Sequence, residues 1–129
     1  MAALAVSLAA CSDITNGLGS YNISGTFQLE TFNGSPLPTI MYQDSFEQHH
    51  LLDETFTIYS DGTYTDDYSV RIFTRNGSSQ SSYRDVGTYT QNNTALQFRD
   101  SQTGDVFVGS ITGNILTISQ LGDVYVFRR

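Results

Sequence analysis

Two acidic residues, Asp66 and Asp85, stand where the alternation of polar and apolar residues predicts side chains that point into the protein interior. A buried carboxylate is unfavourable unless a partner donates a hydrogen bond or carries a positive charge. Tyr68 is predicted to lie opposite Asp85 and to be able to donate its hydroxyl proton to it. Such groups would act as a polar anchor for a ligand amine or hydroxyl, or titrate with a shifted pKa. The alternative is that both carboxylates lie in water at an open rim.

The other reactive side chains form no recognisable catalytic or metal-binding set. His49 and His50 are the two histidines of the chain, and neighbours on a strand point to opposite faces. The pairs Asp53-Glu54 and Asp66-Asp67 lack the spacing of a calcium-binding loop. The sequence contains no glycine-rich phosphate loop and no arguable Ser/His/Asp arrangement. We therefore expect no metal, no cofactor and no enzymatic activity.

The elements that must position these residues are strands. Beyond residue 20, apolar and aromatic residues recur at every second position, and Gly, Asn and Asp interrupt them at short intervals. This period is typical of strands that bury one face. We expect eight strands, at residues 22–32, 49–59, 63–74, 79–90, 94–100, 105–112, 115–120 and 124–129.

Each connection must set buried residues opposite buried residues, because a slip of one residue reverses the face of a strand. The condition is met by turns at Asn76-Gly77, Asn92-Asn93, Ser101–Gly104, Gly113-Asn114 and Gly122-Asp123. These turns predict the opposed pairs Val70–Tyr83, Tyr89–Leu96, Phe98–Phe107, Ile111–Leu116 and Ile118–Phe127. Between the second and third strands, a three-residue loop at 60–62 keeps the faces matched by setting Ile58 opposite Tyr64. That loop predicts a left-handed Gly62 and a G1 bulge.

A sheet with one buried face needs a cover, and the sequence has no helix long enough to supply one. Closing the sheet on itself buries that face and removes both edges. We therefore predict an all-β fold, an eight-stranded antiparallel up-and-down β-barrel. A β-sandwich is the alternative, because it shares the alternation. Gly25, Gly87 and Gly109 fall at inward positions, where aromatic rings can cover bare backbone.

The predicted interior is mostly aromatic. An eight-stranded barrel has room for side chains alone or for one small ligand, so the rings either line a pocket or fill the barrel. The candidate ligand-binding residues are Phe27, Leu29, Phe56, Ile58, Tyr64, Asp66, Tyr68, Tyr83, Asp85, Tyr89, Phe98, Phe107 and Tyr125.

The longest connection covers residues 33–48 and contains Pro36, Pro38 and several apolar residues. It is predicted to be either a lid over one mouth of the barrel or a packed connector with one helical turn.

The first residues of the chain are apolar and end in small side chains, as at the end of a secretory signal peptide. Leu8-Ala9-Ala10-Cys11 resembles the bacterial lipobox, which implies cleavage before Cys11 and lipidation of its thiol. Ser12 as the next residue resembles Gram-negative lipoproteins of the outer membrane. We thus expect a signal-peptide remnant at 1–10, a flexible tether at 11–20 and the barrel domain at 21–129. The alternative is an ordinary N-terminal segment with one buried Cys.

Several short motifs resemble one family of barrels. They are Gly25-Thr-Phe-Gln-Leu, Asn33-Gly-Ser-Pro-Leu-Pro38, Ser60-Asp-Gly-Thr-Tyr64, Gly87-Thr-Tyr89 and Val124-Tyr-Val-Phe-Arg128. With these, residues 22–129 resemble the lipocalin-like (calycin-type) barrels of small bacterial lipoproteins. Classical lipocalins have a Trp after the first-strand Gly, whereas this chain has Thr26 and Phe27 there. The resemblance implies a barrel that binds small apolar molecules.

The net charge is −7, from 13 acidic and 6 basic residues, all of them Arg. Phosphate backbones attract basic surfaces, so nucleic-acid binding is not expected. Membrane attachment would come through the lipid alone. We expect an exported, monomeric cell-envelope protein that binds a small hydrophobic or amphipathic ligand. The alternative is a protein-interaction or inhibitor module with a filled barrel.

Overall fold

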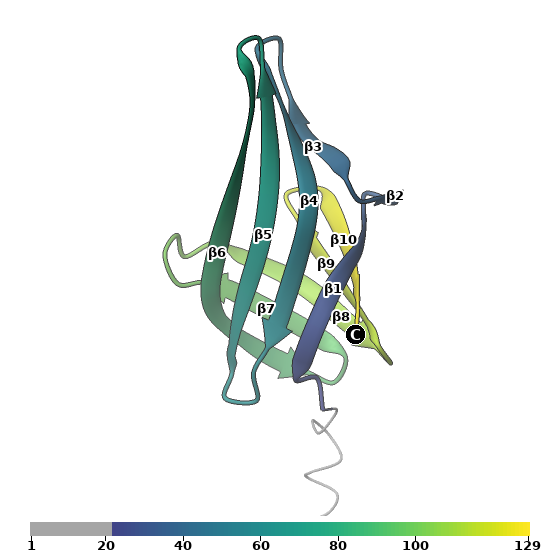
Figure 1. Ribbon diagram of the computed structural model, residues 1–129. Coiled ribbons are helices and arrows are strands. Elements are labelled where there is room, and N and C mark those ends of the chain that lie inside the picture. Colours follow the sequence, from purple (N-terminus) through teal and green to yellow (C-terminus); the bar gives the residue numbers. More distant parts are fainter. Residues whose placement is uncertain (1–21) are drawn as a thin grey trace, which may run out of the picture.

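The computed structural model describes residues 22–129 and consists of antiparallel strands (Figure 1). The predicted tether, Cys11 and the segment before it lie outside the described residues. The strands are β1 (Gly25–Phe32), β2 (Ser35–Pro36), β3 (Thr39–Gln43), β4 (Glu47–Ile58), β5 (Thr63–Thr74), β6 (Gly77–Asn92), β7 (Ala95–Asp100), β8 (Val106–Thr112), β9 (Ile115–Gln120) and β10 (Asp123–Arg128).

The sheet closes because β1 pairs along both of its edges. It pairs with β10 on one side, with Leu29 opposite Phe127, and with β4 on the other, with Phe27 opposite Phe56. From β4 to β10 each strand pairs with the next. The eight strands β1 and β4–β10 therefore form a closed up-and-down barrel. The predicted fold class is confirmed, and the β-sandwich alternative is wrong because a sandwich would leave the first and last strands unpaired with each other.

Three predicted registers are confirmed. The loop at 60–62 sets Ile58 opposite Tyr64, and Gly62 has a φ of 91°, in the left-handed region. Phe98 lies opposite Phe107 across the β7–β8 connection, and Ile111 lies opposite Leu116 across the β8–β9 connection.

The other three registers are wrong by two residues. Val70 pairs with Ser81, Tyr89 with Phe98, and Ile118 with Tyr125. The predicted cross-strand pair of Tyr68 and Asp85 is wrong for the same reason, since Tyr68 lies opposite Tyr83. In each case the two-residue loop starts one position away from the predicted one, which moves every pairing by two and leaves each side chain on its predicted face.

Aromatic rings fill the end of the barrel at which β1 begins. Phe27, Phe56, Tyr64, Phe98 and Phe127 are almost fully buried. Phe56 stacks on Tyr64 with ring centroids 4.9 Å apart, and Phe98 meets both rings edge-on at 5.1 and 5.3 Å. We call these rings the aromatic plug. Such contacts contribute about 0.5–1.5 kcal/mol each beyond the burial of their area.

The C-terminal arginine closes that same end. The Arg129 guanidinium lies 5.1 Å from the centroid of the Phe27 ring and donates to the carbonyl oxygens of Asn22, Ser24 and Gly113. These bonds join the start of the described chain, its end and the turn between β8 and β9. The barrel is thus sealed at one end by packing and hydrogen bonds.

At the other end, part of the sheet continues beyond the barrel as an arm (Figure 1). The arm comprises β3, residues 47–51 of β4, residues 70–74 of β5 and residues 77–81 of β6. Residues 33–48 therefore form strands β2 and β3 with their turns and the first two residues of β4, and the predicted helical turn is wrong. Tyr42 and Gln43 pair with His49 and Gln48, so strand pairing satisfies backbone groups in this part of the connection. No helix within residues 22–129 is long and apolar enough to span a membrane.

The plug requires bare backbone at Gly87. A Cβ at this position would collide with the carbonyl oxygen of Arg99 and would lie 2.6 Å from the Tyr64 ring. We expect Gly87→Ala to lower the free energy of unfolding by about 1–3 kcal/mol, because overpacking forces the backbone or the ring to move. Urea denaturation would measure this, with the exposed neighbour Thr88→Ala as control. A Gly87→Ala protein as stable as the wild type would contradict the packing of Tyr64 on this glycine.

Candidate functional site

A cavity of about 260 Å³ opens at the end of the barrel opposite Arg129. We call it the cup. It lies above the aromatic plug, next to the β9–β10 turn and beneath β3 of the arm. Its lining residues are Met41, Leu51, Glu54, Phe56, Asp66, Tyr68, Asp85, Phe107, Ile118, Gln120, Leu121, Asp123, Tyr125 and Phe127.

The apolar floor of the cup consists of two rings of the plug, Phe56 and Phe127, together with Phe107. All three rings are buried, and Leu51 and Ile118 are buried in the walls of the cup. These residues face inward because they occupy alternate positions on their strands. The sequence left two alternatives, a barrel filled by side chains and a barrel with a pocket. The structure has a filled part at one end and a pocket at the other.

Two buried carboxyl groups, Glu54 and Asp66, lie in the wall of the cup and hydrogen-bond to each other. Burial is the largest cause that raises the pKa of both, and the charge of Asp66 raises that of Glu54 further. The hydrogen bond acts in the opposite sense on Asp66, because a donor favours its ionised form. Glu54 is therefore the protonated partner and donates to Asp66. Such a pair can exchange a proton with a bound group.

Asp66 has acceptor capacity beyond that bond. Its Oδ1 atom is buried and receives no hydrogen bond from an N–H or a hydroxyl of the described residues. Asp85 lies directly opposite Asp66 on the neighbouring strand and is half-buried. Burial raises the pKa of Asp85 as well, with a further contribution from the charge of Asp100. Three carboxyl groups thus meet in one part of the wall.

Two tyrosines complete the polar wall. Tyr68 and Tyr125 are half-buried and line the cup. Burial raises the pKa of Tyr68 to about 12 and also raises that of Tyr125. Both phenols are neutral at physiological pH, so each presents a hydroxyl donor and an aromatic face. No basic side chain lines the cup.

Most of the sequence-predicted interior residues face the barrel axis, but only some of them line the cup. Those in the cup are Phe56, Asp66, Tyr68, Asp85, Phe107 and Tyr125. Those that lie below it and do not line it are Phe27, Leu29, Ile58, Tyr64, Tyr89 and Phe98. The two groups differ in their position along the barrel axis. The alternation of polar and apolar residues predicts which face a side chain is on, but not this position.

The prediction that Tyr83 lies in the barrel interior is wrong, because this residue is 45% exposed. It stacks on Tyr68 with ring centroids 5.2 Å apart. At this point β6 pairs with β5 alone, since its pairing with β7 begins at Gly87. No strand closes the other side, so the ring meets water. The solvated-rim alternative is likewise wrong for Asp66, whose Oδ1 is buried.

Glu54 is the functional candidate that the sequence analysis missed. It is 6% exposed and shares a face with Phe56 and Ile58, which follow it at alternate positions. That spacing was a usable signal. Leu51 was harder to place, because a bulge between Leu51 and Asp53 changes which positions face inward.

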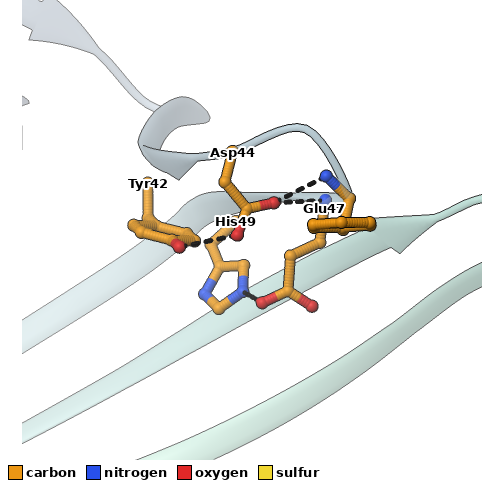
Figure 2. Close-up of polar contacts among 5 residues, drawn as sticks. Tyr42, Asp44, Glu47 and His49 are labelled. Carbon is orange, nitrogen blue, oxygen red and sulfur yellow. Dashed lines mark hydrogen bonds and ion pairs between the residues drawn. The ribbon is translucent and has the colours of Figure 1, made fainter.

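A second polar cluster lies at the tip of the arm (Figure 2). One oxygen of Asp44 accepts hydrogen bonds from the backbone N–H groups of Phe46 and Glu47, and the other accepts the Tyr42 hydroxyl at 2.7 Å. The Tyr42 bond is the largest cause that lowers the pKa of Asp44. Glu47 lies 2.8 Å from His49 Nε2. Each charged group of this cluster has a partner, so its contacts explain the turn without a ligand.

The two histidines contact different aromatic rings of the arm. His49 contacts Tyr42 edge-on, whereas the ring of His50 lies 4.7 Å from that of Phe73. Within residues 22–129 no group of three or more His, Cys, Asp or Glu is placed to hold a metal ion.

Comparisons with known proteins do not identify a family. No protein-family model and no curated protein matches the chain. Among solved structures, it is similar to an uncharacterised protein from Bacteroides eggerthii, with 15% identity, a TM-score of 0.45 and coverage of 82% of this chain and 98% of that one. A lipocalin-like protein from Bacteroides uniformis gives 11% identity, a TM-score of 0.43 and coverage of 82% and 96%. The barrel topology therefore rests on the strand pairing of this chain.

The buried proton on Glu54 predicts an unusual pH dependence. The folded protein keeps a proton that an unfolded Glu releases near pH 4.5. The contribution of Glu54 to stability is therefore greatest below that pH and falls as the pH rises toward the raised folded pKa. The slope is about 1.4 kcal/mol per pH unit for each proton retained. Glu54→Gln keeps the shape and the donor but removes this titration, so its free energy of unfolding should decline less between pH 5 and 8.

Urea denaturation at several pH values in this range would measure the effect. The matched control is Asp53→Asn, the exposed neighbour on the same strand, which should keep the wild-type slope. A wild-type protein whose stability rises between pH 5 and 8, or a Glu54→Gln slope equal to the wild type, would contradict a protonated Glu54.

Proposed function

We propose that this protein is a lipid-anchored protein of the bacterial cell envelope whose barrel binds a small amphipathic ligand in the cup. Binding, and not catalysis, is the proposed activity. The observation that carries it is that the barrel is filled at one end and open at the other. The open part combines an apolar floor with a few convergent polar groups, which is the usual composition of a small-molecule site.

The size of the cup limits the ligand. Its volume of about 260 Å³ is below the roughly 300–1,000 Å³ of pockets for drug-sized ligands. Contact with the floor would contribute about 25 cal/mol per Å² of apolar surface buried, before the cost of ordering the ligand. The ligand is therefore small, with an apolar part for the floor and a polar part for the wall.

The proposed anchor rests on the sequence around Cys11. Leu8-Ala9-Ala10-Cys11 matches the lipobox pattern, and a polar stretch rich in Ser, Asn and Gly follows it. The structure describes the domain from residue 22 onward, and β1 begins at Gly25. A tether between the two would let the barrel stand away from the membrane surface. We propose the outer membrane as the destination, on the basis of Ser12.

The interaction-module alternative draws on a different surface. The arm exposes Ile40, Tyr42, Phe46 and Phe73, with Phe46 76% exposed at its tip. Exposed apolar side chains of this kind occur at protein interfaces. A filled barrel was part of that alternative, and the cup weighs against it.

Native mass spectrometry of the protein purified from its own host would test ligand binding. We expect the wild-type spectrum to contain an adduct with the mass of a small molecule. Ile118→Phe should lose it, because the larger side chain occupies the cup. Val108→Phe adds the same ring on the exposed outer face and should retain it. Bare protein in every spectrum would contradict the proposal, and a protein-sized adduct would favour the interaction module.

Cell fractionation would test the anchor. The wild-type precursor, expressed in its host, should be found in the membrane fraction, with the mature N-terminus at Cys11 carrying acyl mass. Cys11→Ser should release the protein from the membrane fraction, because it removes the thiol that accepts the lipid. Ser12→Ala, which keeps the thiol, should stay with the membrane. An unmodified and uncleaved Cys11 in the native host would contradict lipidation.

A further inference from the structure

We propose that the cup selects small molecules that combine a protonated amine with an apolar body, and that Asp66 is the anchor for the amine. This inference rests on the proposed ligand binding and specifies its chemistry. It starts from the carboxyl pair in the wall, which has no basic residue beside it in the lining of the cup.

The pair retains one proton at neutral pH and can carry one negative charge. Two carboxyl groups in hydrogen-bond contact cannot both ionise at low cost, and Glu54 keeps the proton. Burial raises the pKa of Asp66 to about 7, so its negative charge is only partly formed at neutral pH, and a bound cation would favour the ionised form. An ionised carboxylate has about four acceptor sites, of which Glu54 occupies one, and Asp66 Oδ1 receives nothing from an N–H or hydroxyl donor of the described residues. A buried charge of this kind needs further donors or a counter-charge.

Arginine side chains contact other parts of the molecule, among them Arg71, which donates to Gln80, and Arg99, which donates to the Gly104 carbonyl. Arg84 forms an ion pair with Asp67, and Arg128 forms one with Glu30, both on exposed surfaces. Arg129 lies at the sealed end of the barrel. Among residues 22–129, these ion pairs neutralise acidic side chains outside the barrel, whereas no basic side chain lines the cup beside the carboxyl pair. A cationic ligand would supply the missing charge.

The other acidic residues of the wall also favour a cationic ligand over an anionic one. Asp85 lies opposite Asp66, and Asp123 lines the cup beside the β9–β10 turn. A cavity lined by one sign of charge concentrates ions of the opposite sign. It disfavours carboxylates and phosphates, because no basic group meets them. Fatty acids, the obvious apolar anions, are therefore poor candidates.

The tyrosines and the floor fit the other features of such a ligand. Tyr68 and Tyr125 present aromatic rings to the cup, and a ring face attracts an ammonium group within about 6 Å. Phe56, Phe107 and Phe127 below them offer a floor for one ring or a short alkyl chain. The volume of about 260 Å³ has no room for a long-chain amine to bind entirely within the cup.

Calorimetry at pH 7 with three matched probes would test the inference. The probes are 2-phenylethylamine, 2-phenylethanol and phenylacetate, which share a ring and differ in charge. We expect the wild-type protein to bind the amine about ten-fold or more tightly than the alcohol, because hydrogen bonds to charged groups are stronger than neutral ones. Phenylacetate should bind more weakly than the alcohol.

The variants assign the effect to one residue. Asp66→Asn should lose most of the preference for the amine and keep the binding of the alcohol. Asp67→Asn removes a carboxylate on the outer face of the same strand and should change neither affinity by more than about two-fold. If Asp66→Asn fails to fold, carboxyl NMR of the wild-type protein replaces it, and addition of 2-phenylethylamine should shift the Asp66 resonance and leave that of Asp67 unchanged.

The outcomes separate this inference from the proposed function. Equal affinity for amine and alcohol, or tighter binding of phenylacetate, would overturn the amine selectivity and leave a binding barrel. An Asp66→Asn variant that keeps the full preference, or an unshifted Asp66 resonance, would overturn the role of Asp66. Failure of all three probes would overturn the inference, while the small-molecule adduct in native mass spectrometry decides the proposed function separately.

Discussion

Strand β1 hydrogen-bonds along both edges, to β10 on one side and to β4 on the other. This double pairing turns a meander of hairpins into a closed wall. Without it, the buried face would need a separate cover, and the rings that meet at its centre would be exposed. Arg129 supports the closure at one end, where it joins both ends of the described chain to the β8–β9 turn. The plug, the cup and the carboxyl pair all depend on this enclosure.

Within that enclosure, side-chain size decides what is solid and what is hollow. Tyr64 and Phe98 pack against Gly87 and Gly109, where any added Cβ would meet a ring. Large rings over bare backbone fill the sealed end to a density that leaves no room for a ligand. Toward the other end, carboxyl groups and tyrosines replace phenylalanines, and the strands of the arm diverge from the barrel. The cup is the space that remains.

The carboxyl pair works against stability and is supported by the rest of the fold. Glu54 and Asp66 are removed from water, and Asp66 faces Asp85 across the β5–β6 pairing, an arrangement that like charges disfavour. Strained electrostatics of this kind cluster at functional sites. The surface ion pairs of Arg84 and Arg128 are exposed and contribute little to the free energy of folding. The buried aromatic rings below the acidic wall contribute stability through burial and ring contacts.

The sequence by itself determined the faces of the strands, the number of strands in the barrel and the inward position of the plug residues. These follow from a period of two, which is a local property of the chain and survives any slip by two residues. Tertiary structure alone decided which of two equivalent registers each hairpin adopts, as at Val70 and Ser81. It also decided how far along the axis each ring lies, and that Tyr83 stands outside the barrel. The contact of Glu54 with Asp66 depends on both the local sequence and the tertiary structure. The loop at 60–62 sets Phe56 opposite Asp66, and Glu54 is then the diagonal neighbour of Asp66. Alternation orients a side chain, but only packing between strands distant in sequence fixes its neighbours, and the neighbours determine its chemistry.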